Sequence, residues 1–222
     1  MDAPKNILMY DFPASQYFAQ EFPKTQIVLH HTAGNANALN TFKGWEMDTI
    51  QVATCISVSG KGAGATDGQI VQGYSSKYWA WHLGLQTKVF QQFGLPYLPL
   101  DKSSIGIEIC NWGPVTKTAR GWETYVGTVI PDDQVVEYTK PFKGYQHYHK
   151  YTAAQIESVR QLLLYWGERY GISLDYHEDI WDLCPRALKN DKGIFLHVSY
   201  RADKSDLHPQ PEMITMLKGL KT

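Results

Sequence analysis

Short runs of aliphatic and β-branched residues alternate with polar, glycine-containing stretches through the first half of the chain. Residues 26–30 follow a proline and predict a short buried strand. Residues 52–58 alternate enough to form a second strand, and the glycine-rich stretch 59–68 then turns into another apolar run at 69–72. Between these runs, residues 35–45 are expected to form a loop that enters a helix.

The clearest strand lies at residues 104–109, where the sequence is Ser-Ile-Gly-Ile-Glu-Ile. Side chains alternate across a strand, so the three isoleucines share the core face. Gly106 and Glu108 must then point the other way. A carboxylate between isoleucines on a central strand is either aimed at a cleft or paired with a cation.

Two segments of the second half have the periodicity of helices. Residues 153–170 form the better one, because Thr152 and Gln155 make a capping-box pattern and Gly171 is a good C-terminal stop. Its apolar face repeats at helical spacing through Ile156, Val159, Leu163, Trp166 and Tyr170. A final helix is expected over roughly 210–220 and carries Met213, Ile214, Leu217 and Leu220.

Two further segments are interpreted as irregular or peripheral. Residues 79–84 are expected to form a loop. The segment 111–150 is polar and aromatic, and a Pro-Asp-Asp turn at 131–133 separates the runs 125–130 and 135–138. This pattern predicts a hairpin excursion on the surface.

Strands interspersed with a few helices, with no internal repeat, predict an α/β fold in which a mixed central β-sheet is flanked by helices. At 222 residues we expect a single domain over 1–222, with a surface hairpin insertion at 111–150. The net charge is −1, and Lys and Arg are scattered without a basic stripe, which argues against nucleic-acid binding. The 7 Trp, 14 Tyr and 8 Phe favour packing in the core and loops, and the alternative is a dedicated platform for sugar stacking.

The cysteines and the N-terminal residues indicate the cellular compartment in which the chain is made. Cys55, Cys110 and Cys184 are odd in number and far apart, so we expect small buried thiols and neither a disulfide scaffold nor a thiolate zinc site. Residues 1–6 lack the apolar core of a secretory signal, and no run approaches membrane-spanning length. We therefore expect cytoplasmic synthesis without membrane insertion, so that any action outside the cytoplasm needs help to leave it.

His30, His197 and Asp206 are candidate ligands for a metal ion. His30 ends the apolar run at 27–30, and the other two lie in the C-terminal stretch. Two imidazoles and a carboxylate could together hold one zinc ion, and an open fourth position would hold the water that becomes the nucleophile. These residues favour a metal-dependent hydrolase. The sequence contains no GxSxG, HExxH or phosphate loop, and no cysteine with an evident base.

With these motifs placed, the chain resembles the zinc amidases that cut N-acetylmuramoyl-L-alanine bonds. That family includes phage T7-type lysozyme, the bacterial anhydro-muropeptide amidase and the peptidoglycan-recognition proteins. The matching segments are 27–33, 81–84, 104–109 and 204–206, which come in the family's order along most of the chain. The 111–150 hairpin is not part of the minimal family pattern.

The resemblance implies which residues bind the metal. It makes His30 the first zinc ligand, in preference to its neighbour His31, and His197 and Asp206 the other two. Asp206 follows His197 by nine residues, close to the spacing of the family's ending. An alternative pair after the long helix, His177 and Asp191, is spaced by fourteen residues and is less favoured, as are Asp203 and His208 as substitutes for Asp206.

The resemblance also implies two catalytic residues. Glu108 matches the acidic residue of the family's Ile-Gly-Ile-Glu strand and would act as the general base. Some members use a tyrosine on the second strand, but that strand contains none here, and it has Cys55 where relatives often carry histidine. Lys204 is the expected partner of the oxyanion. The alternatives are a structural Glu paired with a cation and a solvated surface lysine.

The resemblance further implies that four residues border the substrate groove, namely Trp81, His82, Asn111 and Thr32. Packing is the alternative role for an indole in a loop. His147 and His149 have the spacing to share a face, but no third ligand is evident, so we interpret them as exposed residues at the hairpin edge.

These inferences predict a monomeric zinc amidase that acts on peptidoglycan by cleaving the bond between N-acetylmuramic acid and L-alanine. The absence of a signal and of a wall-binding domain fits a phage endolysin that reaches the periplasm through a holin. A cytoplasmic amidase that recycles muropeptides is the nearest alternative. A non-catalytic peptidoglycan-binding protein is the alternative from another class, although such relatives typically lose a ligand that this chain retains.

Overall fold

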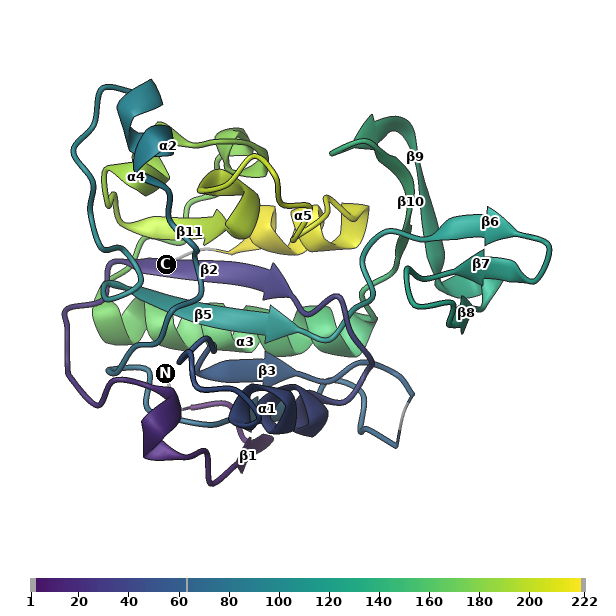
Figure 1. Cartoon of the computed structure of the whole chain (residues 1–222), viewed down its shortest axis with the longest axis horizontal. Coiled ribbons are helices and arrows are strands. Elements are labelled where there is room, and N and C mark those ends of the chain that lie inside the picture. The colour runs from purple at the N-terminus through teal and green to yellow at the C-terminus, as the bar shows by residue number, and fades with distance from the viewer. Residues whose placement is uncertain (1–2, 63, 221–222) are drawn as a thin grey trace.

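The computed structural model describes residues 3–62 and 64–220, and a six-stranded sheet lies at its centre (Figure 1). The strands lie in the order β1-β4-β3-β5-β2-β11, and every neighbouring pair is parallel except β3 and β4. The strands are β1 (Ile7–Met9), β2 (Gln26–His31), β3 (Ile56–Val58), β4 (Ile70–Gln72), β5 (Ser104–Ile109) and β11 (Gly193–Leu196). The α/β fold with a mixed central sheet is therefore confirmed.

The register of the three strands β5, β2 and β11 brings polar side chains together at one edge of the sheet. His30 on β2 is paired with Glu108 on β5, so their side chains emerge on the same face of the sheet. On the other side of β2, Leu196 of β11 is paired with Leu29, and His197 follows immediately. The carboxyl ends of parallel strands thus bring three polar side chains to one edge.

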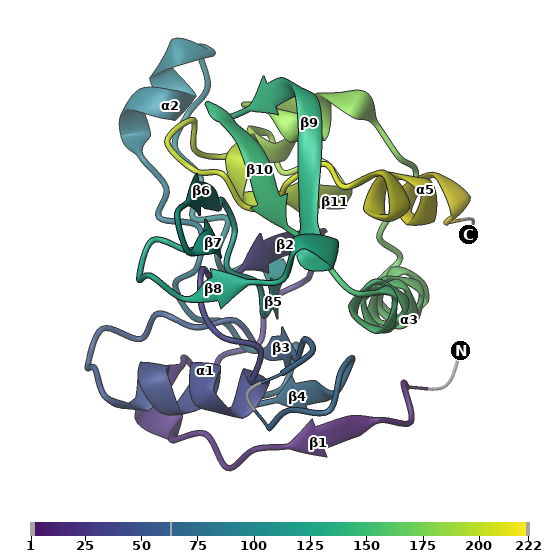
Figure 2. The same ribbon diagram turned by 90° about the vertical axis from the view of Figure 1, so that its right-hand side faces the viewer.

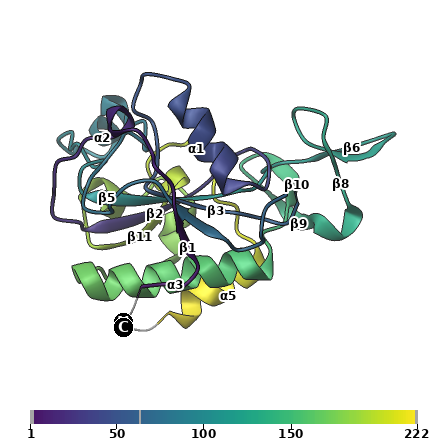
Figure 3. The same cartoon turned by 90° about the horizontal axis from the view of Figure 1, so that it is seen from below.

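Helices cover both faces of the sheet (Figure 3). α3 (Ala153–Tyr170) and α5 (Pro211–Gly219) lie on one face, and α1 (Ala38–Glu46) lies on the other. α3 has the predicted capping box, and Gly171 adopts the left-handed conformation, φ 59°, that ends it. The apolar face of α3 is buried with the isoleucines of β5 in one core, which removes apolar surface from water.

Shorter elements complete this body. α2 (Thr87–Gln92) and α4 (Pro185–Leu188) are brief helices, and 3-10 turns occur at η1 (Ala14–Gln16), η2 (Asp132–Gln134), η3 (Glu178–Trp181) and η4 (His197–Ser199). The second predicted strand is shorter than 52–58, because Val52 makes only an isolated bridge to Trp81 and the Thr54 hydroxyl donates to the Ile56 carbonyl. Residues 79–84 form a loop, as predicted.

The segment 111–150 extends beyond the carboxyl ends of β2 and β5 (Figures 1 and 2). It holds a three-stranded antiparallel sheet of β6 (Thr116–Thr118), β7 (Gly121–Glu123) and β8 (Val129–Ile130), followed by the hairpin of β9 (Val135–Phe142) and β10 (Tyr145–His149). The predicted pairing of 125–130 with 135–138 is wrong. The hairpin turn lies instead at Lys143 and Gly144, which have φ of 46° and 86°.

Two expectations about the whole chain can be compared with the structure. All three cysteines are buried free thiols, as predicted. Among the helices of residues 3–62 and 64–220, none combines the length and apolarity needed to cross a bilayer.

Candidate metal centre and cleft

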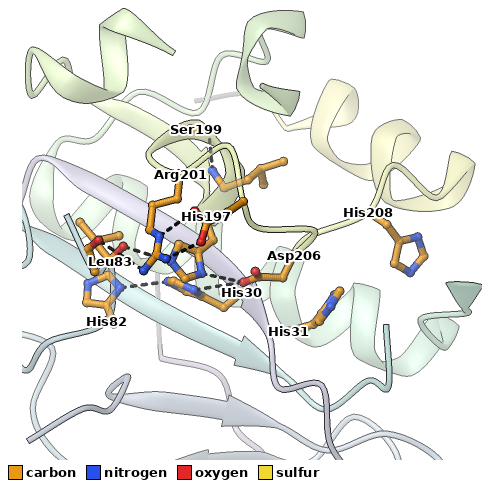
Figure 4. A network of polar contacts seen from close by, with 12 residues as sticks. His30, His31, His82, Leu83, His197, Ser199, Arg201, Asp206 and His208 are labelled. Atoms are coloured by element: carbon orange, nitrogen blue, oxygen red, sulfur yellow. Dashed lines mark hydrogen bonds and ion pairs between the residues drawn. The ribbon is translucent and has the colours of Figure 1, made fainter. Parts of the chain in front are cut away.

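The side chains of His30, His197 and Asp206 point toward one another at the carboxyl edge of the sheet (Figure 4). His30 comes from β2, His197 opens η4 directly after β11, and Asp206 lies in the loop that leads to α5. Asp206 Oδ2 is 3.0 Å from His197 Nδ1 and 3.4 Å from His30 Nδ1. The three ligand atoms lie within 4.8 Å of one another, and all three residues are buried. This group could hold a metal ion.

The hydrogen bonds of His197 leave its Nδ1 free to bind a cation. Its Nε2 lies 3.1 Å from the carbonyl oxygen of Leu83, which can only accept, so Nε2 carries the proton of the neutral ring. Nδ1 is then a lone pair facing the Asp206 carboxylate. Two acceptors at this distance repel each other unless a proton or a metal ion lies between them. The donor set therefore fits a metal cation.

A chain of hydrogen bonds gives His30 the same tautomer. Its Nε2 lies 2.9 Å from His82 Nδ1, and His82 Nε2 lies 2.8 Å from Ser104 Oγ. The Ser104 hydroxyl donates to the Leu100 carbonyl at 2.8 Å, so it accepts from His82 Nε2, and His82 Nδ1 accepts from His30 Nε2. The Nδ1 lone pair of His30 is thereby directed toward Asp206.

The ionisation of these groups is consistent with metal binding. Burial, followed by the neighbouring His197, lowers the pKa of His30 to about 4, which keeps its ring neutral. For Asp206, burial acts to raise the pKa, but the contacts with the His197 and His30 rings outweigh it and hold the pKa well below its usual value. Neutral imidazoles and an ionised carboxylate are the forms that bind a metal.

Gly106 leaves space for the His82 side chain next to the metal group. It lies on the same face of β5 as Glu108, and a Cβ there would come within 2.5 Å of Thr54 and 3.1 Å of His82 Nδ1. The backbone N–H groups of His82 and Leu83 also donate to the Asp101 carboxylate, at 2.8 and 2.9 Å. The loop that supports both ligand histidines is therefore held from two sides.

His31 and His208 are directed away from this group (Figure 4). His31 Nδ1 lies 2.9 Å from the hydroxyl of Tyr151, and His208 Nδ1 lies 2.7 Å from the hydroxyl of Tyr138. Strand alternation explains the first case, because adjacent residues of β2 face opposite sides of the sheet. Both histidines belong to a buried network that joins the 111–150 segment to the main body.

The less favoured ligand candidates do not belong to this group. His177, Asp191 and Asp203 are exposed, and Asp203 forms an ion pair with Arg201. Within residues 3–62 and 64–220, none of them joins a cluster of three potential metal ligands.

Glu108 lies in the wall of the cleft beside the metal group. Burial, with Asp206 nearby, raises the pKa of Glu108 well above its usual value, and Lys204 only partly opposes this shift. Its Oε2 is buried and has no hydrogen-bond partner among the described residues. A carboxylate with a raised pKa and a free oxygen can exchange a proton with a ligand in the cleft.

A central cleft of about 530 Å³ opens over these residues, and Lys204 lines it together with Glu108. Three of the four predicted groove residues line it as well, namely Trp81, His82 and Thr32. The Trp81 side chain is 38% exposed, whereas both ring nitrogens of His82 are used by His30 and Ser104. His82 therefore supports a candidate ligand in this structure.

Asn111 does not reach the cleft surface. The residue is fully buried, and its side-chain amide donates to the carbonyls of His149 and Lys150 and accepts from the N–H of Gly113. It holds the start of the 111–150 segment and cannot contact a substrate in this conformation. His147 and His149 are half-buried, not exposed as expected. The His147 ring packs against Trp122, and His149 Nδ1 accepts from the backbone N–H of Trp112.

Sequence reasoning missed the groups that orient the ligands. No sequence motif marks Ser104 or the Leu83 carbonyl. Only the folded structure places them next to the ligand histidines. The signal that could have found them is the glycine of β5, since a residue without a side chain on the cleft face indicates that another group occupies the space.

The fold is shared with solved structures. The structure titled "Structure of PlyL" is 15% identical, with 98% of each chain covered and a TM-score of 0.52. The catalytic domain of XlyA is 16% identical, with 96% of this chain and 97% of that chain covered and a TM-score of 0.52. A mutant endolysin from Bacillus subtilis is 16% identical, with 96% of each chain covered and a TM-score of 0.53. These likenesses concern the fold.

The sequence itself settles the family. The model of the Amidase_2 family, described as N-acetylmuramoyl-L-alanine amidase, matches residues 21–209. The chain belongs to this family and is an amidase, which confirms the resemblance drawn from its motifs. No curated protein sequence gives a significant match.

Proposed function

We propose that the chain is a zinc-dependent amidase that hydrolyses the bond between the lactyl group of N-acetylmuramic acid and the L-alanine of the peptidoglycan stem peptide. One observation carries the zinc dependence. The Nδ1 atoms of His30 and His197 are both left as lone pairs that converge with the Asp206 carboxylate. Two imidazoles and one carboxylate, with a cleft above them, are typical of a hydrolytic zinc site.

Zinc held by these residues supplies a Lewis acid that polarises the amide carbonyl and makes a water molecule more acidic. Glu108 takes the proton from the attacking water and delivers it to the leaving nitrogen of L-alanine. Its raised pKa suits both transfers, because the group must bind the proton and then release it. The Lys204 ammonium stabilises the negative charge that develops on the carbonyl oxygen.

The proposed setting is lysis of a bacterial cell by a phage. Support comes from similar folds, since one of the similar solved structures is titled an endolysin. Zinc-dependent recycling of muropeptides uses the same chemistry on small substrates. The two settings differ in whether the enzyme attacks intact sacculi.

The test is mass spectrometry of purified sacculi digested by the enzyme in the presence of zinc or of a chelator. We expect stem peptides with a free L-alanine amino terminus and peptide-free glycan, released only when zinc is available. A His177→Ala variant serves as the matched control and should retain this activity, since that histidine is exposed and outside the cluster. Reducing-end sugars as products, or digestion that persists in the chelator, would refute the proposal.

A further inference from the structure

A second hollow, the outer groove, lies where the 111–150 segment meets the main body. It has a volume of about 370 Å³, and its walls include Trp112, Tyr125, Tyr145 and the threonines of β6. Figure 1 shows the sheet β6–β8 projecting beyond the carboxyl ends of β2 and β5.

The outer groove is continuous with the central cleft. His31, Ala33 and Ser205 line both hollows, and Ser205 immediately precedes Asp206. The hydroxyl of Tyr125 donates to the Ala33 carbonyl at 3.0 Å, which fixes the 111–150 segment to the loop after β2. A ligand that crosses the metal group can therefore extend into the outer groove without leaving the protein surface.

The walls of the outer groove present aromatic rings to solvent. Tyr125 is 74% exposed and Tyr145 is 49% exposed. The Trp112 and Tyr125 rings lie 6.4 Å apart at 64°, so they form two sides of an angled aromatic surface. Exposed rings grouped in a hollow mark a binding surface. The Thr116 hydroxyl adds a polar group along its edge, whereas the Thr118 hydroxyl donates to Glu123 at 2.6 Å.

The charges of the two hollows differ. No lysine or arginine is among the described residues that line the outer groove, and its one carboxylate, Glu123, is paired with Arg120 at 2.7 Å. The central cleft, in contrast, is lined by Lys204 and by Arg201, which is paired with Asp203 of the same lining. A stem peptide bears carboxylates and finds cations only in the central cleft. A glycan offers apolar ring faces and neutral hydroxyls, which match aromatic rings and threonines.

We propose that the outer groove is a subsite for the glycan strand, in which sugar rings next to the cleaved muramic acid stack on Tyr125 and Trp112. This inference rests on the proposed function, because it assumes that the muramoyl amide lies at the metal group. The 111–150 segment then makes the enzyme favour polymeric peptidoglycan over single muramoyl-peptides.

The test compares two soluble substrates with the same stem peptide, one carried on a single muramic acid and one carried on a glycan of several disaccharides. For Tyr125→Ala we expect KM to rise about three- to tenfold on the longer glycan, the effect of losing one aromatic contact. On the single muramic acid KM should change by less than about twofold. Tyr125→Phe keeps the ring and should retain the preference, and Tyr97→Ala, an exposed tyrosine outside both hollows, is the control.

A binding measurement separates this inference from the proposed activity. A peptide-free glycan oligosaccharide should bind the wild-type enzyme, and Tyr125→Ala should weaken that binding by the same factor. If neither substrate is cleaved by any variant, the proposed function fails whatever the glycan binding shows. The subsite is refuted if Tyr125→Ala affects both substrates equally, or if the free stem peptide rather than the glycan loses affinity.

Discussion

His30 Nε2 lies 2.9 Å from His82 Nδ1, although 52 residues separate the two histidines in the sequence. The contact continues through Ser104 to the Leu100 carbonyl, so each group in the chain has one donor and one acceptor assigned. A histidine that binds a metal usually donates its other ring N–H to a partner that fixes its orientation. Here that partner is a second histidine, which is an unusual use of a neutral imidazole as acceptor.

This relationship predicts that His82 controls metal affinity. In His82→Ala the His30 N–H loses its acceptor, and we expect the affinity for zinc to fall about 10- to 100-fold, as for other groups that orient a ligand. Competition against a fluorescent zinc chelator measures this directly. Ser104→Ala should produce a smaller loss in the same direction.

The control for His82 is another histidine outside the chain of hydrogen bonds. His147 lies on β10 and packs against Trp122, with ring centroids 4.3 Å apart and the rings tilted by 37°. His147→Ala should leave zinc affinity unchanged. If His82→Ala binds zinc as tightly as this control does, His82 belongs to the substrate contacts, as its sequence motif first suggested.

Glu108→Gln should abolish turnover while zinc stays bound. Glutamine keeps the size of the side chain but cannot accept the proton of the attacking water, so kcat should fall about 100-fold or more. Zinc content by elemental analysis should match that of the wild type. An active Glu108→Gln enzyme would refute the assignment of Glu108 as the base.

The same variant should be more stable without metal. Burial raises the pKa of Glu108 in the folded chain above its unfolded value, so folding favours the protonated form. The cost of ionisation is therefore absent below the unfolded pKa and grows as the pH rises above it. In a chelator, Glu108→Gln should gain roughly 1 to 3 kcal/mol at neutral pH and almost nothing at pH about 4. Thermal denaturation at both pH values measures the difference, and an equal gain at both would contradict the role of ionisation.

Local patterns predicted the elements that their own residues stabilise. The strand at 104–109 and the helix at 153–170 have the predicted bounds, because alternation and capping act between near neighbours in sequence. The pairing predicted within 111–150 is wrong, since the pairing depends on which of several short strands meet. The turn that decides it places Lys143 at a positive φ, a conformation that its side chain does not indicate.

The metal ligands of the candidate site could be predicted from the sequence, but the residues that orient these ligands could not. Histidine and aspartate at motif positions are visible in sequence, and the fold brings His30, His197 and Asp206 together. The role of His82 and the burial of Asn111 depend on contacts made across the sheet. The resemblance to the family implies only that both lie at the substrate groove, and it does not show which groups they contact.

Lys204 should act on the chemical step rather than on metal binding. Lys204→Met keeps the aliphatic stem and removes the ammonium, and we expect kcat to fall roughly 100-fold, with zinc affinity unchanged. Steady-state kinetics on a soluble muramoyl-peptide tests this. Lys88→Met, an exposed lysine of α2, is the control and should remain fully active. If KM rises in the Lys204→Met enzyme while kcat is unchanged, the lysine contributes to substrate binding instead.

Zinc removal should lower both activity and stability. We expect the stabilisation by zinc to depend on His197 and not on His177. Zinc binds the folded cluster and not the unfolded chain, so wild-type enzyme at 100 times the dissociation constant should gain about 2.7 kcal/mol. His197→Ala should lose this gain, whereas His177→Ala should keep it, because His177 is exposed. Denaturation with and without zinc compares the three proteins. If His177→Ala loses the gain and His197→Ala keeps it, the metal binds near His177 and Asp191. His30, His197 and Asp206 are then not the ligands.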